Sequence, residues 1–198
     1  TEELEKINSV KEHSAILTAQ IMAFFRTDSE LLKDIKVRQA LVSAVNGPAI
    51  VKGLDYPTIV SDEPLLRGQM GYNSGARQFT YNPEQANKLL DEAGWTRPAE
   101  GQTRVKGTTK LELNFSAKNS QDFTYVSQQL QQYWQAVGVG TKVTLLSDDD
   151  LIITISSRNY DVLLHGISIG TDPDVFPYWH SSQTDPRAPT RLNLSNYK

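Results

Sequence analysis

The clearest amphipathic pattern lies in residues 81–95, where apolar residues recur every three or four positions. Asn82 is a typical helix cap, Pro83 suits the first helical turn, and Gln85 follows the cap at the spacing of a capping box. Gly94 suits the left-handed turn that ends a helix. These signals predict a short scaffold helix, docked on a sheet by one stripe formed by Ala86, Leu89, Leu90 and Ala93.

Helical spacing predicts two further long helices. Residues 34–46 have Asp34 as a cap, and residues 123–137 have Gly138 as a stop. Asn46–Gly47–Pro48 ends the first of these and begins a short helix that stops near Gly53.

The secondary structure of three other segments is less clear from the sequence. The Glu-rich residues 1–8 favour a helix, and the nearly continuous apolar run 14–27 favours a buried strand. In residues 148–158 three Asp residues favour a helix start, whereas the Ile residues behind them favour a strand. We predict a helix there, because a strand has to follow.

Strands are predicted where apolar residues alternate or run continuously. Residues 111–115 alternate, 141–146 are rich in β-branched residues, and 160–169 are apolar on both faces, as in a central parallel strand. Lys106–Gly107 predicts a hairpin turn. Because strand and helix alternate over 111–146, we expect a right-handed βαβ unit and an α/β fold.

Two segments lack any periodicity. Residues 54–80 contain many Gly and Pro and predict a long irregular loop, of the kind that is functional or pinned to a partner surface. Residues 170–190 are rich in Pro, Asp and aromatic residues and also predict a loop.

Composition excludes several classes of function. The chain has 198 residues, a net charge of −3 and no Cys, so it has neither disulfides nor thiolate chemistry, and no basic block for nucleic acid. No apolar run reaches the roughly 20 residues of a membrane helix. The three His residues lack ligand spacing, Asp148–Asp150 suit a solvated helix start better than a cation site, and no catalytic or nucleotide motif occurs. We therefore expect no enzyme, no metal and no cofactor.

Four segments in order resemble one family: "DIKVRQALVSAVN", "YNPEQANKLLDEAGW", "YDVLLHGISIGTDPDVFPYW" and "LNLSNYK". From Thr1 to Lys198 the chain is similar to the C-terminal lobe of the extracytoplasmic solute-binding proteins, family 5, that serve oligopeptide and dipeptide ABC importers. "VRQAL" and the Asn-Pro-Glu-x-Ala-x-x-Leu-Leu-x-x-Ala-Gly-Trp pattern are specific only in combination.

The resemblance implies one lobe of a type II periplasmic-binding-protein fold, with a mixed, mostly parallel sheet flanked by helices. Residues 1–198 would be a fragment that lacks the N-terminal lobe and the final C-terminal helices. The implied partners are a peptide or other small-molecule ligand, that missing lobe and ABC permease subunits. The implied location is the periplasm or the cell surface, with any membrane attachment made by a lipid anchor outside this fragment.

The resemblance also implies a ligand site in the turn after the strand 160–169, because ligands of open α/β sheets lie beyond the carboxyl ends of the strands. In peptide-binding relatives this turn commonly has Gly-Trp and then an Asp that pairs with the peptide ammonium. Here Gly166 is kept, but Ile167 replaces that Trp and Gly170 replaces that Asp. The expected cleft-lining residues are Ile167, Ser168, Ile169, Gly170, Thr171 and Asp172, with Asp172 as an alternative carboxylate.

Three residues outside this turn are candidates with an open alternative. Trp179 and His180 form an aromatic wall of the cleft or pack in the core. Arg26 binds a ligand carboxylate or lies at the surface or the lobe interface. Asp174 fits an Asp-Pro-Asp turn.

Three other functions remain open for the sequence. The cargo of the same fold can be an oligosaccharide or a metal chelate, the chain can be a sensing domain of a transcriptional regulator, or it can be an unfamiliar hydrolase that depends on Asp172 or His180.

Overall fold

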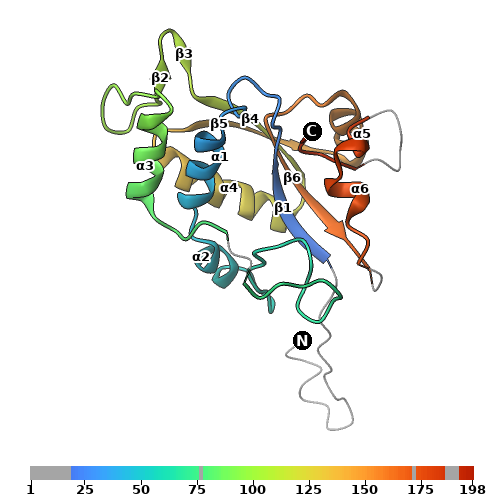
Figure 1. Cartoon of the computed structure of the whole chain (residues 1–198). Helices are drawn as coiled ribbons and strands as arrows, with labels where there is room; N and C mark the ends of the chain where they lie inside the picture. The colour runs from blue at the N-terminus through green and yellow to red at the C-terminus, as the bar shows by residue number, and fades with distance from the viewer. Residues whose placement is uncertain (1–18, 76–77, 171–172, 186–191) are drawn as a thin grey trace.

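A central four-stranded sheet with strand order β1-β6-β4-β5 organises the molecule (Figure 1). The computed structural model describes residues 19–75, 78–170, 173–185 and 192–198. β4 is parallel to both β5 and β6, whereas β1 is antiparallel to β6. The predicted mixed, mostly parallel sheet is therefore confirmed. Its strands are β1 (Ala19–Phe25), β4 (Glu112–Lys118), β5 (Gly140–Leu146) and β6 (Val162–Ser168).

The helices begin where the capping residues predicted them. Asp34 Oδ1 accepts from Lys36 N, and Asn82 Oδ1 accepts from Gln85 N, both at 2.8 Å. Ser147 caps the disputed segment that starts with three Asp residues, so the prediction of a helix there is confirmed. The helices are α1 (Ile35–Ser43), α2 (Gly47–Lys52), α3 (Pro83–Glu92), α4 (Gln121–Ala136), α5 (Asp148–Ser157) and α6 (Phe176–Trp179), followed by the 3-10 turn η1 (Ser181–Gln183).

Four local predictions need correction or lie wholly or partly outside the described residues. The hairpin of β2 (Val105–Lys106) and β3 (Thr109–Lys110) pairs Lys106 with Thr109, so the turn is Gly107–Thr108, with φ +61° at Gly107. The segment predicted as a loop after residue 170 contains α6 and η1, because Pro177 sits in a first helical turn, where it costs no hydrogen bond. The helix predicted over 1–8 and the strand residues 14–18 lie outside the described part of the chain.

The sheet separates two apolar clusters. On one face, Phe115 and Trp134 pack with residues of α1, α3 and α4. On the other face, Phe24, Leu151 and Leu163 pack with Trp179 of α6. Neighbouring residues of β6 point to opposite clusters, as the predicted two-faced burial of this strand requires.

The helix α3 has the predicted scaffold role in a modified form. Its apolar stripe lies in the first cluster, but α3 packs chiefly against α1 rather than directly on the sheet. Gly94 has φ +83° and turns the chain, and Trp95 behind it is buried.

Candidate functional site

The carboxyl ends of the three parallel strands share one edge of the sheet. β4, β5 and β6 end there at Lys118, Leu146 and Ser168, and β1 begins there because Ala19 pairs with Ser168. Ligands of open α/β sheets bind beyond this edge. We therefore take this end of the sheet, called the carboxyl edge below, as the candidate site. The opposite end, where β4, β5 and β6 begin, is called the amino edge and is compared with it.

The turn after β6 presents main chain rather than large side chains. Ile167 and Ile169 are 3% and 8% exposed, and both pack into the second cluster. The Ser168 side chain between them is exposed, and Gly170 has φ +69°, which favours glycine. Ile167 and Ile169 can offer a ligand only backbone groups. Thr171 and Asp172 lie outside the described residues.

The long loop spans residues 54–82, of which 76 and 77 lie outside the described residues. Its part 54–75 packs against the same edge, next to the start of β1 (Figure 1). Gln20 Nε2 donates to Pro64 O at 2.7 Å, and Gln69 Nε2 donates to Gly170 O at 2.9 Å. The loop is thus pinned to the turn after β6 of its own chain. The exposed large apolar side chains of the loop are Tyr56, Ile59, Val60, Met70, Phe79 and Tyr81.

Contacts between the other strand ends complete this edge. Lys118 Nζ lies 2.7 Å from Asp148 Oδ1, and Asn119 N donates to Leu146 O at 2.8 Å. Tyr56 Oη donates to Asp122 at 3.1 Å, and desolvation, then that bond, raises the pKa of Tyr56. We did not predict these residues as site candidates. Ligands bind beyond the carboxyl ends of parallel strands, and this rule indicates these residues when it is applied to β4 and β5 as well as to β6.

Arg26 and Trp179 lie toward the amino end of β6, away from Gly170. Arg26 N donates to Asp161 O at 2.9 Å, its Nη1 donates to Arg158 O, and its Nε lies 3.0 Å from Asp28 Oδ1. The ring of Trp179 packs against Phe24, with centroids 6.4 Å apart. Arg26 therefore lies apart from the turn after β6, whereas Trp179 packs against the apolar cluster that also contains Ile167 and Ile169.

Trp179 instead lines a hollow of about 270 Å³ beside β1. His180 is exposed and stacks on Phe176, with ring centroids 4.5 Å apart. Asp174 Oδ1 accepts from Phe176 N at 2.9 Å, which is the turn role expected of it. The other residues that line the hollow are Ala23, Phe25, Thr27, Arg38, Asn193, Ser195 and Tyr197.

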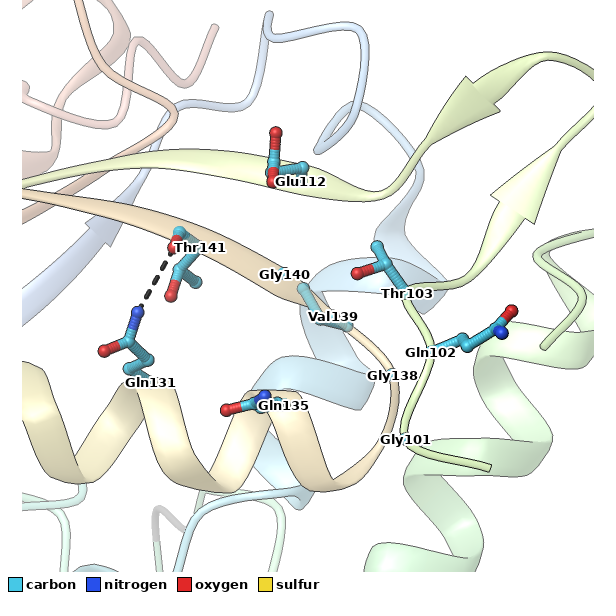
Figure 2. Close-up of a pocket in the computed structure, with 10 residues that line it drawn as sticks. All are labelled: Gly101, Gln102, Thr103, Glu112, Gln131, Gln135, Gly138, Val139, Gly140 and Thr141. Atoms are coloured by element: carbon cyan, nitrogen blue, oxygen red, sulfur yellow. Dashed lines mark hydrogen bonds between the residues drawn. The ribbon is translucent and has the colours of Figure 1, made fainter. Parts of the chain in front are cut away.

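A second, polar hollow of about 210 Å³ lies at the amino ends of β4 and β5 (Figure 2). Two of its polar side chains are engaged, since Gln131 Nε2 donates to Thr141 O at 3.2 Å and Glu112 pairs with Lys142 at 2.7 Å. Among the described residues, the buried Thr141 Oγ1 has no hydrogen-bond partner. Ligand pockets are usually larger, about 300–1,000 Å³, and mostly apolar. This hollow is therefore a weaker candidate for the ligand site than the carboxyl edge.

Burial shifts two titrating groups near β6. Desolvation lowers the pKa of His165, which keeps the imidazole neutral near pH 7. Burial raises the pKa of Tyr160 to about 12, and its hydroxyl donates to Leu194 O at 2.8 Å.

Metal binding and membrane insertion find no support in the described residues. His, Asp and Glu side chains do not gather there in groups of three or more that could hold a metal ion. Within the same residues, every helix is too short or too polar to cross a bilayer.

Comparison with known proteins matches residues 1–187 to the family of bacterial extracellular solute-binding proteins, family 5 Middle. The chain is 27% identical over 189 residues to the oligopeptide-binding protein AppA of Bacillus subtilis, which covers 90% of this chain and 34% of that protein. The structure of AppA in complex with a nonapeptide matches with a TM-score of 0.85 and 25% identity, over 100% of this chain and 40% of that one.

A second solved structure, which contains a bound metal chelate, is also similar to this chain. The structure of NikZ from Campylobacter jejuni in complex with Ni(L-His) matches with a TM-score of 0.80 and 30% identity, over 91% of this chain and 36% of that one. The chain thus spans little more than a third of the length of these relatives. On the extent of the family match, this chain belongs to the bacterial extracellular solute-binding proteins of family 5.

Proposed function

We propose that this chain is the C-terminal lobe of a two-lobed solute-binding protein that captures peptides and passes them to an ABC permease. The missing lobe would face the carboxyl edge of the sheet, and the cargo would lie between the two lobes. The observation that supports this most is the carboxyl edge itself, where the exposed Ser168 and the turn to Gly170 lie beside a pinned loop with exposed apolar side chains.

The chemistry of this edge suits a peptide. Main-chain donors and acceptors can pair with a peptide backbone whatever its side chains are. The exposed apolar side chains of loop 54–82 offer contacts to cargo side chains without selecting one strictly. The cleft-lining residues we propose are Ile167, Ser168, Ile169 and Gly170, with Thr171 and Asp172 beyond them in sequence.

The mechanism is a shift between open and closed lobe arrangements. Contacts that cargo makes with both lobes favour the closed state, which the permease recognises. One lobe makes only part of these contacts. We therefore expect the isolated chain to bind peptide at millimolar level or not at all, and micromolar binding by calorimetry would contradict the division into two lobes.

A metal chelate is the second candidate cargo, because the match to the Ni(L-His) complex has the higher identity of the two structural matches. Mass spectrometry of small molecules retained by the full-length protein separates the candidates. Retained peptides support the first proposal, a retained chelate the second, and retained oligosaccharides contradict both.

The proposed setting is outside the membrane, with the full-length protein held by a lipid anchor on a segment before this chain. The sequence preceding Thr1 tests it. A signal peptide with a lipidation cysteine supports import, whereas a helix-turn-helix segment would indicate a sensing domain of a transcriptional regulator.

A further inference from the structure

One glutamine connects the long loop to the turn after β6. Gln69 Nε2 donates to Gly170 O at 2.9 Å, and Gln69 Oε1 accepts from Leu66 N at 2.7 Å. The same side chain therefore closes its own loop segment and holds a residue 101 positions away in sequence. Both ends of its amide are used, so its orientation is fixed.

The turn that Gln69 holds has a special backbone. Gly170 has φ +69°, and nothing lies within 4 Å of the place where a Cβ would stand. Glycine is favoured there by the backbone conformation rather than by lack of space. Because glycine is conformationally free, a bond to its carbonyl does much to select one orientation of this turn.

A second tether fixes the other side of the loop. Gln20 is buried, and its Nε2 donates to Pro64 O at 2.7 Å. Gln20 pairs with Ile167 across β1 and β6, so both tethers reach the end of β6. Met70 follows Gln69 directly and is 85% exposed. The segment 64–70 is thus held beside the turn with an apolar side chain free for contact.

We propose that Gln69 is a positioning residue of the cargo site, an inference that rests on the function proposed above. It orients the Gly170 carbonyl and hence the turn 167–170 that meets the cargo. The same bond holds the segment 64–70 beside the turn as a second wall of the cleft on this lobe. Cargo that contacts the turn therefore also affects the segment 64–70.

Two matched variants of the full-length protein test this role. Gln69→Glu keeps an oxygen for Leu66 N but loses the donor to Gly170 O. Gln78→Glu makes the same chemical change in the same loop, where Gln78 Nε2 donates to Asp62 O at 2.9 Å and not to the turn. Both variants add one negative charge, so their difference reports the bond to Gly170.

The first measurement is the affinity for a synthetic mixture of di- to pentapeptides, determined by calorimetry. The second is the rate of backbone hydrogen exchange in the protein segment 165–170. We expect Gln69→Glu to weaken binding by about 3- to 10-fold, the worth of one positioned hydrogen bond. Gln78→Glu should change the affinity by less than about 2-fold. Without cargo, exchange over 165–170 should quicken only in Gln69→Glu, at an unchanged midpoint of thermal unfolding.

Three results overturn the proposal: equal weakening by both variants, unchanged exchange over 165–170, or faster exchange with unchanged affinity. If the wild-type protein binds none of the peptides, the proposed peptide cargo fails separately. In that case the exchange comparison still decides whether Gln69 holds the turn.

Discussion

The two edges of the sheet use polar side chains in opposite ways. At the amino edge, Arg104 is 2% exposed and donates to Val137 O, Trp95 O and two side chains, and Asp161 accepts from Ser29 Oγ and Asn114 N. At the carboxyl edge, Gln20 and Gln69 hold a loop whose apolar side chains remain exposed. At the amino edge, Arg104 and Asp161 find their partners within the chain, whereas the carboxyl edge leaves apolar side chains exposed that could contact a partner.

The largest expected effect lies at the amino edge. Arg104→Met should reduce the free energy of unfolding by about 4 kcal/mol, because it leaves buried carbonyl groups without donors and removes a buried charge from its partners. Denaturant unfolding of the chain measures this loss.

The ion-pair partner of Arg104 provides the control. The Asp91 side chain is 64% exposed, so Asp91→Asn should cost below about 1 kcal/mol. Equal losses in the two variants would show that the ion pair, rather than the buried carbonyl bonds, stabilises this edge.

An intermediate effect concerns pH and lies on β6 near the carboxyl edge. Burial lowers the pKa of His165, so the unfolded chain binds a proton more readily than the folded one. Stability should therefore fall as the pH drops below about 6.5, the ordinary value, by at most about 1.4 kcal/mol per pH unit, and level off below the folded pKa.

His165→Gln should remove this part of the pH dependence. Unfolding free energies of both proteins at pH 7.5 and 5.5 test the assignment. An identical acid loss in the variant would mean that other groups cause it.

The smallest effect on stability is expected at the carboxyl edge. Met70→Ser should change the unfolding free energy by less than about 0.5 kcal/mol, because the side chain is exposed. In the full-length protein it should still weaken peptide binding by about 3-fold, since it removes apolar contact area.

Ile153→Ser on α5 is the matched control, because Ile153 is also an exposed apolar residue but lies on a helix. Equal effects of the two substitutions on peptide affinity would remove the distinction between loop 54–82 and other exposed apolar surface.

Local chemistry made most of the fold predictable. Asn82, Asp34 and Ser147 each cap a helix through a bond to a residue two or three positions away, so the pattern is written in adjacent sequence. The apolar run of β6 likewise predicted a central strand between two packed faces. These signals come from residues that are close together in the sequence, and such local patterns can be recognised in a single sequence.

The contacts that shape the candidate site left no such signal. Gln69 meets Gly170 across 101 positions, and a single glutamine has no period. Arg26 was a candidate because it stands near the end of the predicted strand 14–27, but β1 runs antiparallel to β6, so this end lies at the amino edge. Trp179 lies on α6, which packs along the sheet where a loop was predicted.

The most direct test of the carboxyl edge as the gripping surface is hydrogen exchange of the full-length protein with and without the cargo it retains. We predict that cargo slows exchange over 165–170 and 61–73 and leaves the segments around Arg26 and Arg104 unchanged. Protection confined to those amino-edge segments, with unchanged exchange over 165–170, would contradict the account.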